Sequence, residues 1–220
     1  MRDSQVIAAH DLQHHFADMD QQRESSTLGM WVFLVTEIMF FGGLFAAYLV
    51  YRTTHYQAWQ IGSEHMEFWL GTINTVILLC SSLFVALAVH AAQTGDNKLC
   101  ATYLFIAAAM GLVFLGVKGI EYHQHFVEGA VPGRFWHLDT PDPGPVQMFF
   151  YIYFVMTGLH AIHVTIGIVL LAVIGWFALR GRYSPEYHNP VHVSGLYWHF
   201  VDVVWIFLYP LLYLIAHKKA

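Results

Sequence analysis

Five long apolar stretches constrain this chain more than any other feature of its sequence. Each extends for about 18 to 30 residues, which is enough for a helix to cross ~30 Å of hydrocarbon. Hydrophobic residues make up 57% of the 220 residues and charged residues only 11%, whereas a soluble domain has about 25% charged residues. So few charges could not cover the surface of a globule in water. The sequence therefore predicts an all-α membrane protein, a bundle of five transmembrane helices.

The apolar stretches place the expected spans at about residues 28–51, 68–89, 99–119, 147–179 and 195–215. A polar N-terminal tail, residues 1–27, precedes this core of residues 28–217, and a short tail, residues 218–220, follows it. Residues 52–67 are expected to form a polar link between the first two spans. Gly95-Asp96-Asn97 predicts a tight turn, which makes the second and third spans antiparallel neighbours. Four prolines and three glycines between residues 123 and 145 exclude a further helix there.

Charge and cysteine usage exclude several classes of protein. Lys and Arg number 10 against 15 Asp and Glu, so the chain has no basic surface for nucleic acid. Cys80 and Cys100 lie in or beside apolar stretches, where packing is a better explanation than a disulfide. The polar N-terminus does not resemble a cleaved signal peptide. Basic residues divide five against five between the two sides, so the positive-inside rule does not decide the orientation.

Ionisable and amide side chains inside the spans are costly and need a partner or a function. Six of them stand out: Glu37, Asn74, His160, His163, His199 and Asp202. Glu37 lies about 14 Å into the first helix, where a carboxyl group should be protonated or hydrogen-bonded to another helix. Two interpretations stay open, a neutral acid that fixes helix packing or a group in a proton relay or lipid site. Asn74 is most simply a hydrogen bond between helices.

The histidines allow several interpretations. His160 and His163 share one helix face, and either could in principle ligate a haem together with His199. A zinc site would need further ligands that the neighbouring sequence does not supply. The simplest interpretation is that these imidazoles face inward and are satisfied by Glu37, Asp202 or backbone carbonyls. His199 and Asp202 are three residues apart and could pair within one helix.

Other polar and aromatic residues are expected at the membrane surface. Lys118 and Glu121 predict a snorkelling pair near one interface, and Tyr197 and Trp198 are typical of an interfacial aromatic belt. The sequence contains no catalytic serine or cysteine arrangement, glycine-rich phosphate loop or CxxC pair. The pattern therefore indicates a helical scaffold with a polar seam rather than an enzyme acting by itself.

Four blocks resemble one known family. Leu28-Gly-Met-Trp-Val-Phe-Leu-Val-Thr-Glu37 is similar to the opening helix of the shared core of subunit III of the haem–copper oxidases. Gly119-Ile-Glu121-Tyr122 is similar to the exit of its third span. The two most characteristic blocks run from Thr157 to Gly167, with His160 and His163, and from Tyr197 to Trp205, with His199 and Asp202. The resemblance extends from about Leu28 to His217.

The resemblance implies a non-catalytic accessory subunit of a proton-pumping terminal oxidase that reduces dioxygen to water. Such a subunit binds no haem or copper itself, and both belong to its partners, catalytic subunit I and a copper-carrying or quinol-type subunit II. The resemblance also implies that the subunit binds structural phospholipid and supports proton uptake. It allows membership of a larger respiratory supercomplex. Glu37 falls on the family's membrane-buried glutamate and His163 on a histidine near it, so a hydrogen bond between them beside the lipid cleft is expected. The implied location is a bacterial inner membrane, with the N-terminus in the cytoplasm and the C-terminus outside.

One departure from the family pattern bears on these expectations. Mitochondrial-type members have two further helices before this core, which form one wall of the lipid cleft, and here a polar tail precedes Leu28. The five-helix form also occurs in quinol oxidases and in a protein associated with nitric oxide reductase, so a subunit of these remains the alternative. The alternative from another class is a b-type haem cytochrome that uses His160 or His163 with His199.

Overall fold

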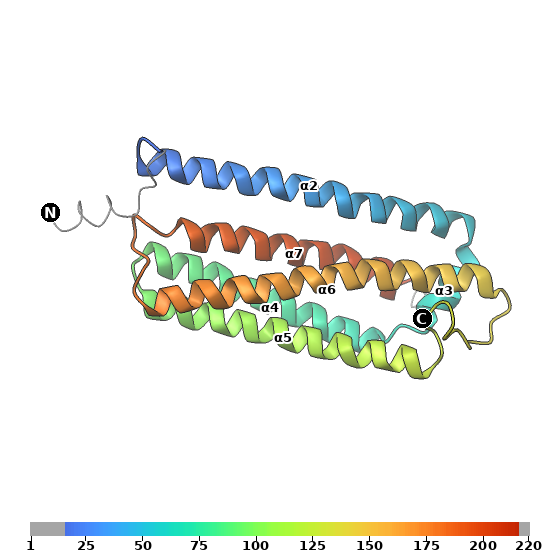
Figure 1. Cartoon of the computed structure of the whole chain (residues 1–220). Coiled ribbons are helices and arrows are strands. Elements are labelled where there is room, and N and C mark those ends of the chain that lie inside the picture. Colours follow the sequence, from blue (N-terminus) through green and yellow to red (C-terminus); the bar gives the residue numbers. More distant parts are fainter. Residues whose placement is uncertain (1–15, 216–220) are drawn as a thin grey trace, which may run out of the picture. The chain divides into compact units, whose positions relative to one another are not determined.

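A computed structural model describes residues 16–215, and this part of the chain is almost entirely helical (Figure 1). Its helices are α2 (Met19–Thr54), α3 (Tyr56–Glu64), α4 (Phe68–Gln93), α5 (Asn97–Val127), α6 (Pro143–Leu179) and α7 (Asn189–Tyr213). Within residues 16–215 the β-structure is limited to an isolated bridge between Ala130 and Trp136. The all-α class predicted from the sequence is therefore confirmed.

Five of these helices, α2, α4, α5, α6 and α7, are long and apolar enough to cross a membrane, as the sequence predicts. They contain 36, 26, 31, 37 and 25 residues, so even the shortest spans about 37 Å at 1.5 Å per residue. α2 begins at Met19, inside the segment expected to be a polar tail, and α5 continues to Val127. Residues 1–15 of the expected tail and the expected tail 218–220 lie outside the described residues.

The short helix α3 was not predicted, because residues 52–67 appear polar when counted by composition alone. Its buried residues are Ala58, Trp59, Gly62 and Ser63, which recur at helical spacing on one face. The Trp59 ring packs edge-on against Phe149 of α6, with ring centroids 5.7 Å apart. Ser63 Oγ donates a hydrogen bond to the Leu212 carbonyl of α7 at 3.1 Å. Burial of one apolar face therefore makes a helix of this link.

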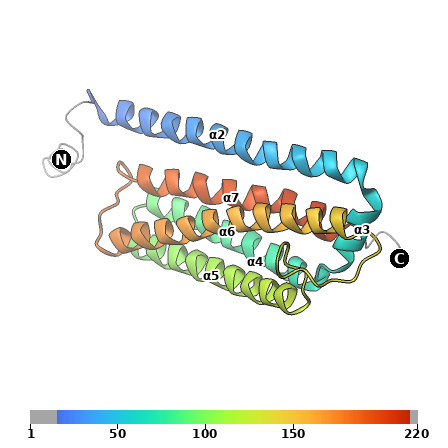
Figure 2. The same cartoon turned by 45° about the vertical axis from the view of Figure 1, so that its right-hand side comes forward.

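The connections between the spans follow the sequence predictions. Gly95 adopts φ +84° between α4 and α5, a conformation that favours glycine, and it ends the turn that joins these two helices. Between α5 and α6 the chain forms no helix (Figure 2). Within this connection His137 N–H donates to the Gly129 carbonyl at 2.8 Å, next to the isolated bridge. The proline- and glycine-rich segment is thus an ordered loop.

The chain divides into two compact units, each of which contains parts of all five long helices. Unit 1 consists of Met1–Glu37, Cys80–Ala109 and Ile166–Phe200, and unit 2 of Ile38–Leu79, Met110–Thr165 and Val201–Ala220. The described core of unit 1 contains mostly small and aliphatic side chains with Trp198. That of unit 2 contains many fully buried aromatic side chains: Trp59, Phe114, Phe149, Tyr153, Trp205 and Tyr213. The polar contacts of each unit can therefore be described separately.

In unit 1, α6 and α7 approach closely at Gly167. A Cβ atom at this position would lie 2.7 Å from Cε3 of Trp198, closer than van der Waals contact allows. The Trp198 ring is completely buried, so it has no open space into which to move. The sequence expectation that Trp198 belongs to an interfacial belt is therefore wrong. The indole instead fills the space that the missing glycine side chain leaves.

Gly167→Ala should lower the stability of the chain, because the added methyl group overpacks this contact. We expect a loss of about 1–3 kcal/mol, measured as a lower apparent melting temperature in mild detergent. Gly116→Ala on α5 is the matched control, since nothing lies within 4 Å of a Cβ atom there. The control should melt at the wild-type temperature or slightly above it, because alanine favours a helix over glycine. Equal melting temperatures for the two variants would contradict the assigned contact.

Candidate functional site

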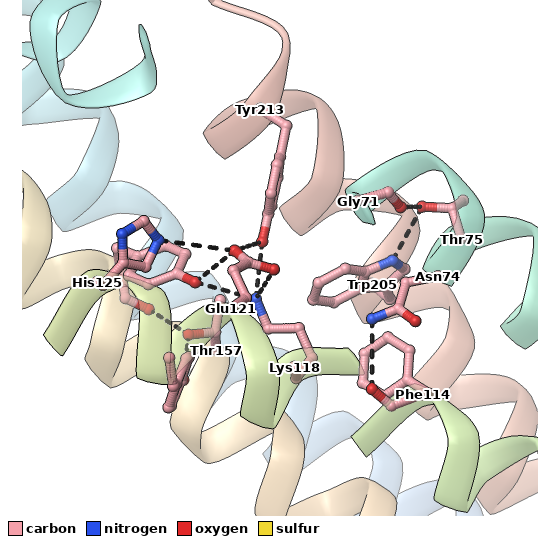
Figure 3. A network of polar contacts seen from close by, with 12 residues as sticks. Gly71, Asn74, Thr75, Phe114, Lys118, Glu121, His125, Thr157, Trp205 and Tyr213 are labelled. Carbon is pink, nitrogen blue, oxygen red and sulfur yellow. Dashed lines mark hydrogen bonds and ion pairs between the residues drawn. The ribbon is translucent and has the colours of Figure 1, made fainter. Parts of the chain in front are cut away.

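The most polar buried site of the described chain lies in unit 2, around one ion pair of α5 (Figure 3). Lys118 is 4% exposed and Glu121 is fully buried, and Lys118 Nζ lies 3.0 Å from Glu121 Oε2. The two residues are three apart, so one helical turn brings their side chains together. The sequence correctly pairs them but wrongly expects them to snorkel to an interface. Both charges are enclosed by α6 and α7 instead.

Two tyrosines complete this network from the neighbouring helices. The hydroxyl groups of Tyr153 on α6 and Tyr213 on α7 donate to Glu121 Oε1 at 2.6 and 2.5 Å. Lys118 Nζ in turn donates to the same two hydroxyl oxygens at 3.0 and 2.7 Å. Each hydroxyl thus accepts from the ammonium and donates to the carboxylate. This closed set of hydrogen bonds is what allows two charges to be buried together.

The Lys118 ammonium also lies within an aromatic enclosure. Nζ is 5.0 to 5.4 Å from the ring centroids of Tyr122, Tyr153, Trp205 and Tyr213. Ring faces attract a cation electrostatically at such distances. His125 lies on the other side of the carboxylate, with Nε2 3.9 Å from Glu121 Oε1. The ring faces around the ammonium therefore stabilise the ion pair.

A second group of hydrogen bonds joins α5 to α6 beside the ion pair. Thr157 Oγ1 donates to the Tyr153 carbonyl at 2.7 Å and lies 2.5 Å from the Tyr122 hydroxyl. Because the threonine proton is used for the carbonyl, the Tyr122 hydroxyl is the donor to Thr157.

α4 is joined to the other helices of unit 2 by Asn74 and Thr75. Asn74 Nδ2 donates to the Phe114 carbonyl of α5 at 3.3 Å, the hydrogen bond between helices that the sequence suggests. Trp205 Nε1 on α7 donates to Thr75 Oγ1 at 3.0 Å, and Thr75 Oγ1 donates to the Gly71 carbonyl at 2.8 Å (Figure 3). These bonds tie α4 to α5 and α7.

His160 is held by aromatic packing. Its ring stacks on Trp205 with centroids 5.2 Å apart and meets the edge of Phe114 at 5.6 Å. Among residues 16–215 neither ring nitrogen of His160 has a hydrogen-bond partner, although the side chain is 1% exposed. The structure thus brings two predicted residues, Asn74 and His160, to the same neighbour, Phe114.

His163 lies one turn further along the same helix. Its Nδ1–H donates to the Leu159 carbonyl at 2.8 Å, so a neutral imidazole presents Nε2 as a hydrogen-bond acceptor. The ring also packs edge-on against Phe41 of α2, with centroids 5.3 Å apart. Of the other predicted residues, Glu37 on α2 is partly exposed and Asp202 on α7 is 3% exposed.

In unit 1 the polar contacts join α4, α5 and α7. Trp198 Nε1 donates to Ser81 Oγ at 3.1 Å, and Ser81 Oγ donates to the Ala107 carbonyl of α5 at 3.1 Å. His199 Nδ1 lies 2.6 Å from Ser82 Oγ, which ties this predicted residue to α4. Sequence reasoning did not anticipate this serine pair.

The tyrosines of the ion-pair network were also missed, although a signal for them exists. Tyr153 lies within an apolar span and Tyr213 near the end of another, where a buried hydroxyl group needs a partner. Lys118 and Glu121, which lie inside one span, can be the hydrogen-bond partners of these hydroxyl groups. Sequence alone did not show that helices distant along the chain would bring these groups together.

Within residues 16–215, no group of three or more histidine, cysteine, aspartate or glutamate side chains is arranged to hold a metal ion. The chain is thus a helical membrane protein whose buried polar residues form hydrogen bonds between its helices and an ion pair within α5. Comparison with known proteins identifies the family. Residues 4–217 match the family of cytochrome c oxidase subunit III, and the chain belongs to that family.

Individual relatives agree with this result. Cytochrome c oxidase subunit 3 of Thermostichus vulcanus is 39% identical over 190 residues, which cover 86% of this chain and 87% of that protein. The protein of the same name from Synechocystis is 36% identical over 189 residues, covering 85% and 74%. A probable quinol oxidase subunit 3 of Staphylococcus aureus is 31% identical over 196 residues, covering 88% and 90%. The family resemblance predicted from the sequence is confirmed.

Removing one charge of the buried pair should destabilise the chain more than removing both. Lys118→Met leaves a buried carboxylate and Glu121→Gln leaves a buried ammonium, so each should cost about 3–5 kcal/mol. The double variant removes both charges and keeps an amide oxygen that accepts from the tyrosines, so its melting temperature in detergent should lie nearer that of the wild type. Lys98→Met, at an exposed position of the same helix, is the control and should change little. Additive losses in the double variant would contradict the pairing.

Proposed function

We propose that this chain is the non-catalytic accessory subunit of a proton-pumping terminal oxidase of the respiratory chain. The observation that carries the proposal is the match to the subunit III family over residues 4–217. The haem and copper that reduce dioxygen to water would be held by partner subunits, a catalytic subunit I and a subunit II. This chain would stabilise the catalytic subunit, hold lipid and support proton uptake. The enclosed network around Lys118 and Glu121 suits a rigid scaffold, since its charges are used within the chain.

The identities of the relatives favour cytochrome c over quinol as the electron donor of the complex. The two relatives named as cytochrome c oxidase subunits are 39% and 36% identical to this chain, whereas the one named as a quinol oxidase subunit is 31% identical. A quinol oxidase therefore remains the alternative within the family. The proposed location is the bacterial inner membrane, with the N-terminus in the cytoplasm and the C-terminus outside.

We further propose that Glu37 and His163 each have a lipid- or proton-related role, as the resemblance to the family implies. The Nδ1–H of His163 donates to the Leu159 carbonyl, so a neutral imidazole has Nε2 as its acceptor. The neutral state is the least costly one for a carboxyl group and an imidazole within hydrocarbon.

Purification of the chain through an affinity tag in mild detergent tests the proposed function. Mass spectrometry should recover a large haem–copper subunit together with a subunit II, and the type of subunit II identifies the electron donor. A chain that purifies without these subunits and with a haem absorption band of its own would contradict the proposal. That band would need to disappear on substitution of His160, His163 or His199 to support a b-type cytochrome.

Glu37→Gln in the purified oxidase tests the role of this carboxyl group. An amide can keep a hydrogen bond but cannot exchange a proton, so we expect slower proton uptake and faster loss of activity during turnover. Proton uptake is followed with a pH-sensitive dye and activity by oxygen consumption. Thr36→Ser on the same helix serves as a control, because it retains the hydroxyl group that donates to the Phe33 carbonyl. Unchanged proton uptake and inactivation in Glu37→Gln would show that the residue serves packing alone.

A further inference from the structure

The Ser82–His199 pair of unit 1 lies near the middle of α4 and of α7, at the surface of the chain. His199 is about 15 Å along α7 from its start at Asn189, and Ser82 is about 16 Å along α4 from its end at Gln93. Each position is thus about half of a ~30 Å hydrocarbon layer from the helix end. Both side chains are partly exposed. A polar pair is therefore presented outward where the surroundings are most apolar.

The hydrogen bond to Ser82 satisfies only one nitrogen of the imidazole. If the serine hydroxyl donates to Nδ1, the neutral ring has Nε2–H as a second donor. If Nδ1–H donates to the serine, Nε2 is an acceptor. In either tautomer the outer nitrogen needs a hydrogen-bond partner, because an unsatisfied polar group in hydrocarbon is costly.

A lipid cannot supply this partner at such a depth. The acyl chains that fill the centre of a bilayer carry no hydrogen-bonding group, and the headgroups lie about 15 Å away. A polar side chain of another membrane helix can supply it, as histidine, serine and asparagine do between transmembrane helices. The surface beside the pair permits close approach, since Ala86 is exposed one helical turn from Ser82 on the same face of α4. Small residues at such positions let the backbones of two helices come together.

We infer that the outer face of α4 and α7 around Ser82, Ala86 and His199 is the docking surface for a transmembrane helix of the haem–copper catalytic subunit. That helix presents a hydrogen-bonding side chain to Nε2 of His199 at the middle of the membrane. The inference rests on the proposed function, which supplies the partner. It goes beyond that function by assigning the interface to one face of the chain and to one polar contact.

Two substitutions of His199 distinguish the hydrogen bond of Nδ1 to Ser82 from the proposed hydrogen bond of Nε2 to the partner helix. The amide of glutamine reaches the position of Nε2, whereas the amide of asparagine reaches only that of Nδ1. His199→Gln should therefore retain the catalytic subunit in tag purification. His199→Asn should weaken its retention by about 3- to 30-fold, the range expected for one hydrogen bond between membrane helices. The readout is the ratio of the two subunits after graded detergent washes, and the melting temperature of the isolated chain checks folding.

Photo-crosslinking tests the surface independently of that hydrogen bond. Benzoylphenylalanine at Ala86 should form an adduct with the catalytic subunit in the intact complex. The same probe at Ala109, an exposed alanine of α5 in the same unit, is the matched control and should form no adduct with the catalytic subunit. Equal retention of His199→Asn and His199→Gln, or an adduct only from Ala109, would overturn the docking surface while the complex itself still forms. A wild-type chain that recovers no catalytic subunit would contradict the proposed function and this inference together.

Discussion

The membrane interior offers no hydrogen-bond partner, and the buried charges of unit 2 are arranged under this constraint. The ion pair of Lys118 and Glu121 shows how the chain meets it. Both charges come from one turn of α5, and their remaining hydrogen bonds are made by a tyrosine of α6 and a tyrosine of α7. Because the two hydroxyl groups serve both charges, the three helices can pack only with these faces together. A network that satisfies its polar groups also determines how helices of unit 2 are rotated.

The sequence predicted what depends on length and on local spacing. Five spans follow from the apolar stretches alone, and the partnership of Lys118 with Glu121 follows from their separation of three residues. Asn74 was correctly assigned to a bond between helices, because an amide within hydrocarbon has few other options. Each of these predictions can be made from one segment of the sequence and from the apolar character of the membrane around it.

The sequence did not predict what depends on which helices become neighbours. The burial of the ion pair needs Tyr153 and Tyr213, which lie far from it along the chain. Trp198 resembles an interfacial residue until Gly167 is known to leave room for its ring. α3 is a helix because its Trp59 face packs on α6, and a composition that is polar on average conceals that face. The family, in contrast, was recognisable because its motifs are contiguous blocks of sequence.

The most direct test of this account is a cryo-electron microscopy map of the tagged complex in lipid nanodiscs. We expect Lys118 and Glu121 to be enclosed between α5, α6 and α7, and His199 to meet a polar side chain of the haem–copper subunit at the α4–α7 face. Acyl-chain density covering that face, with the catalytic subunit docked elsewhere, would contradict the claim that the outer nitrogen of His199, Nε2, marks the interface. A map in which Lys118 and Glu121 are separated and face lipid would contradict the claim that the charges of this ion pair are satisfied within the chain.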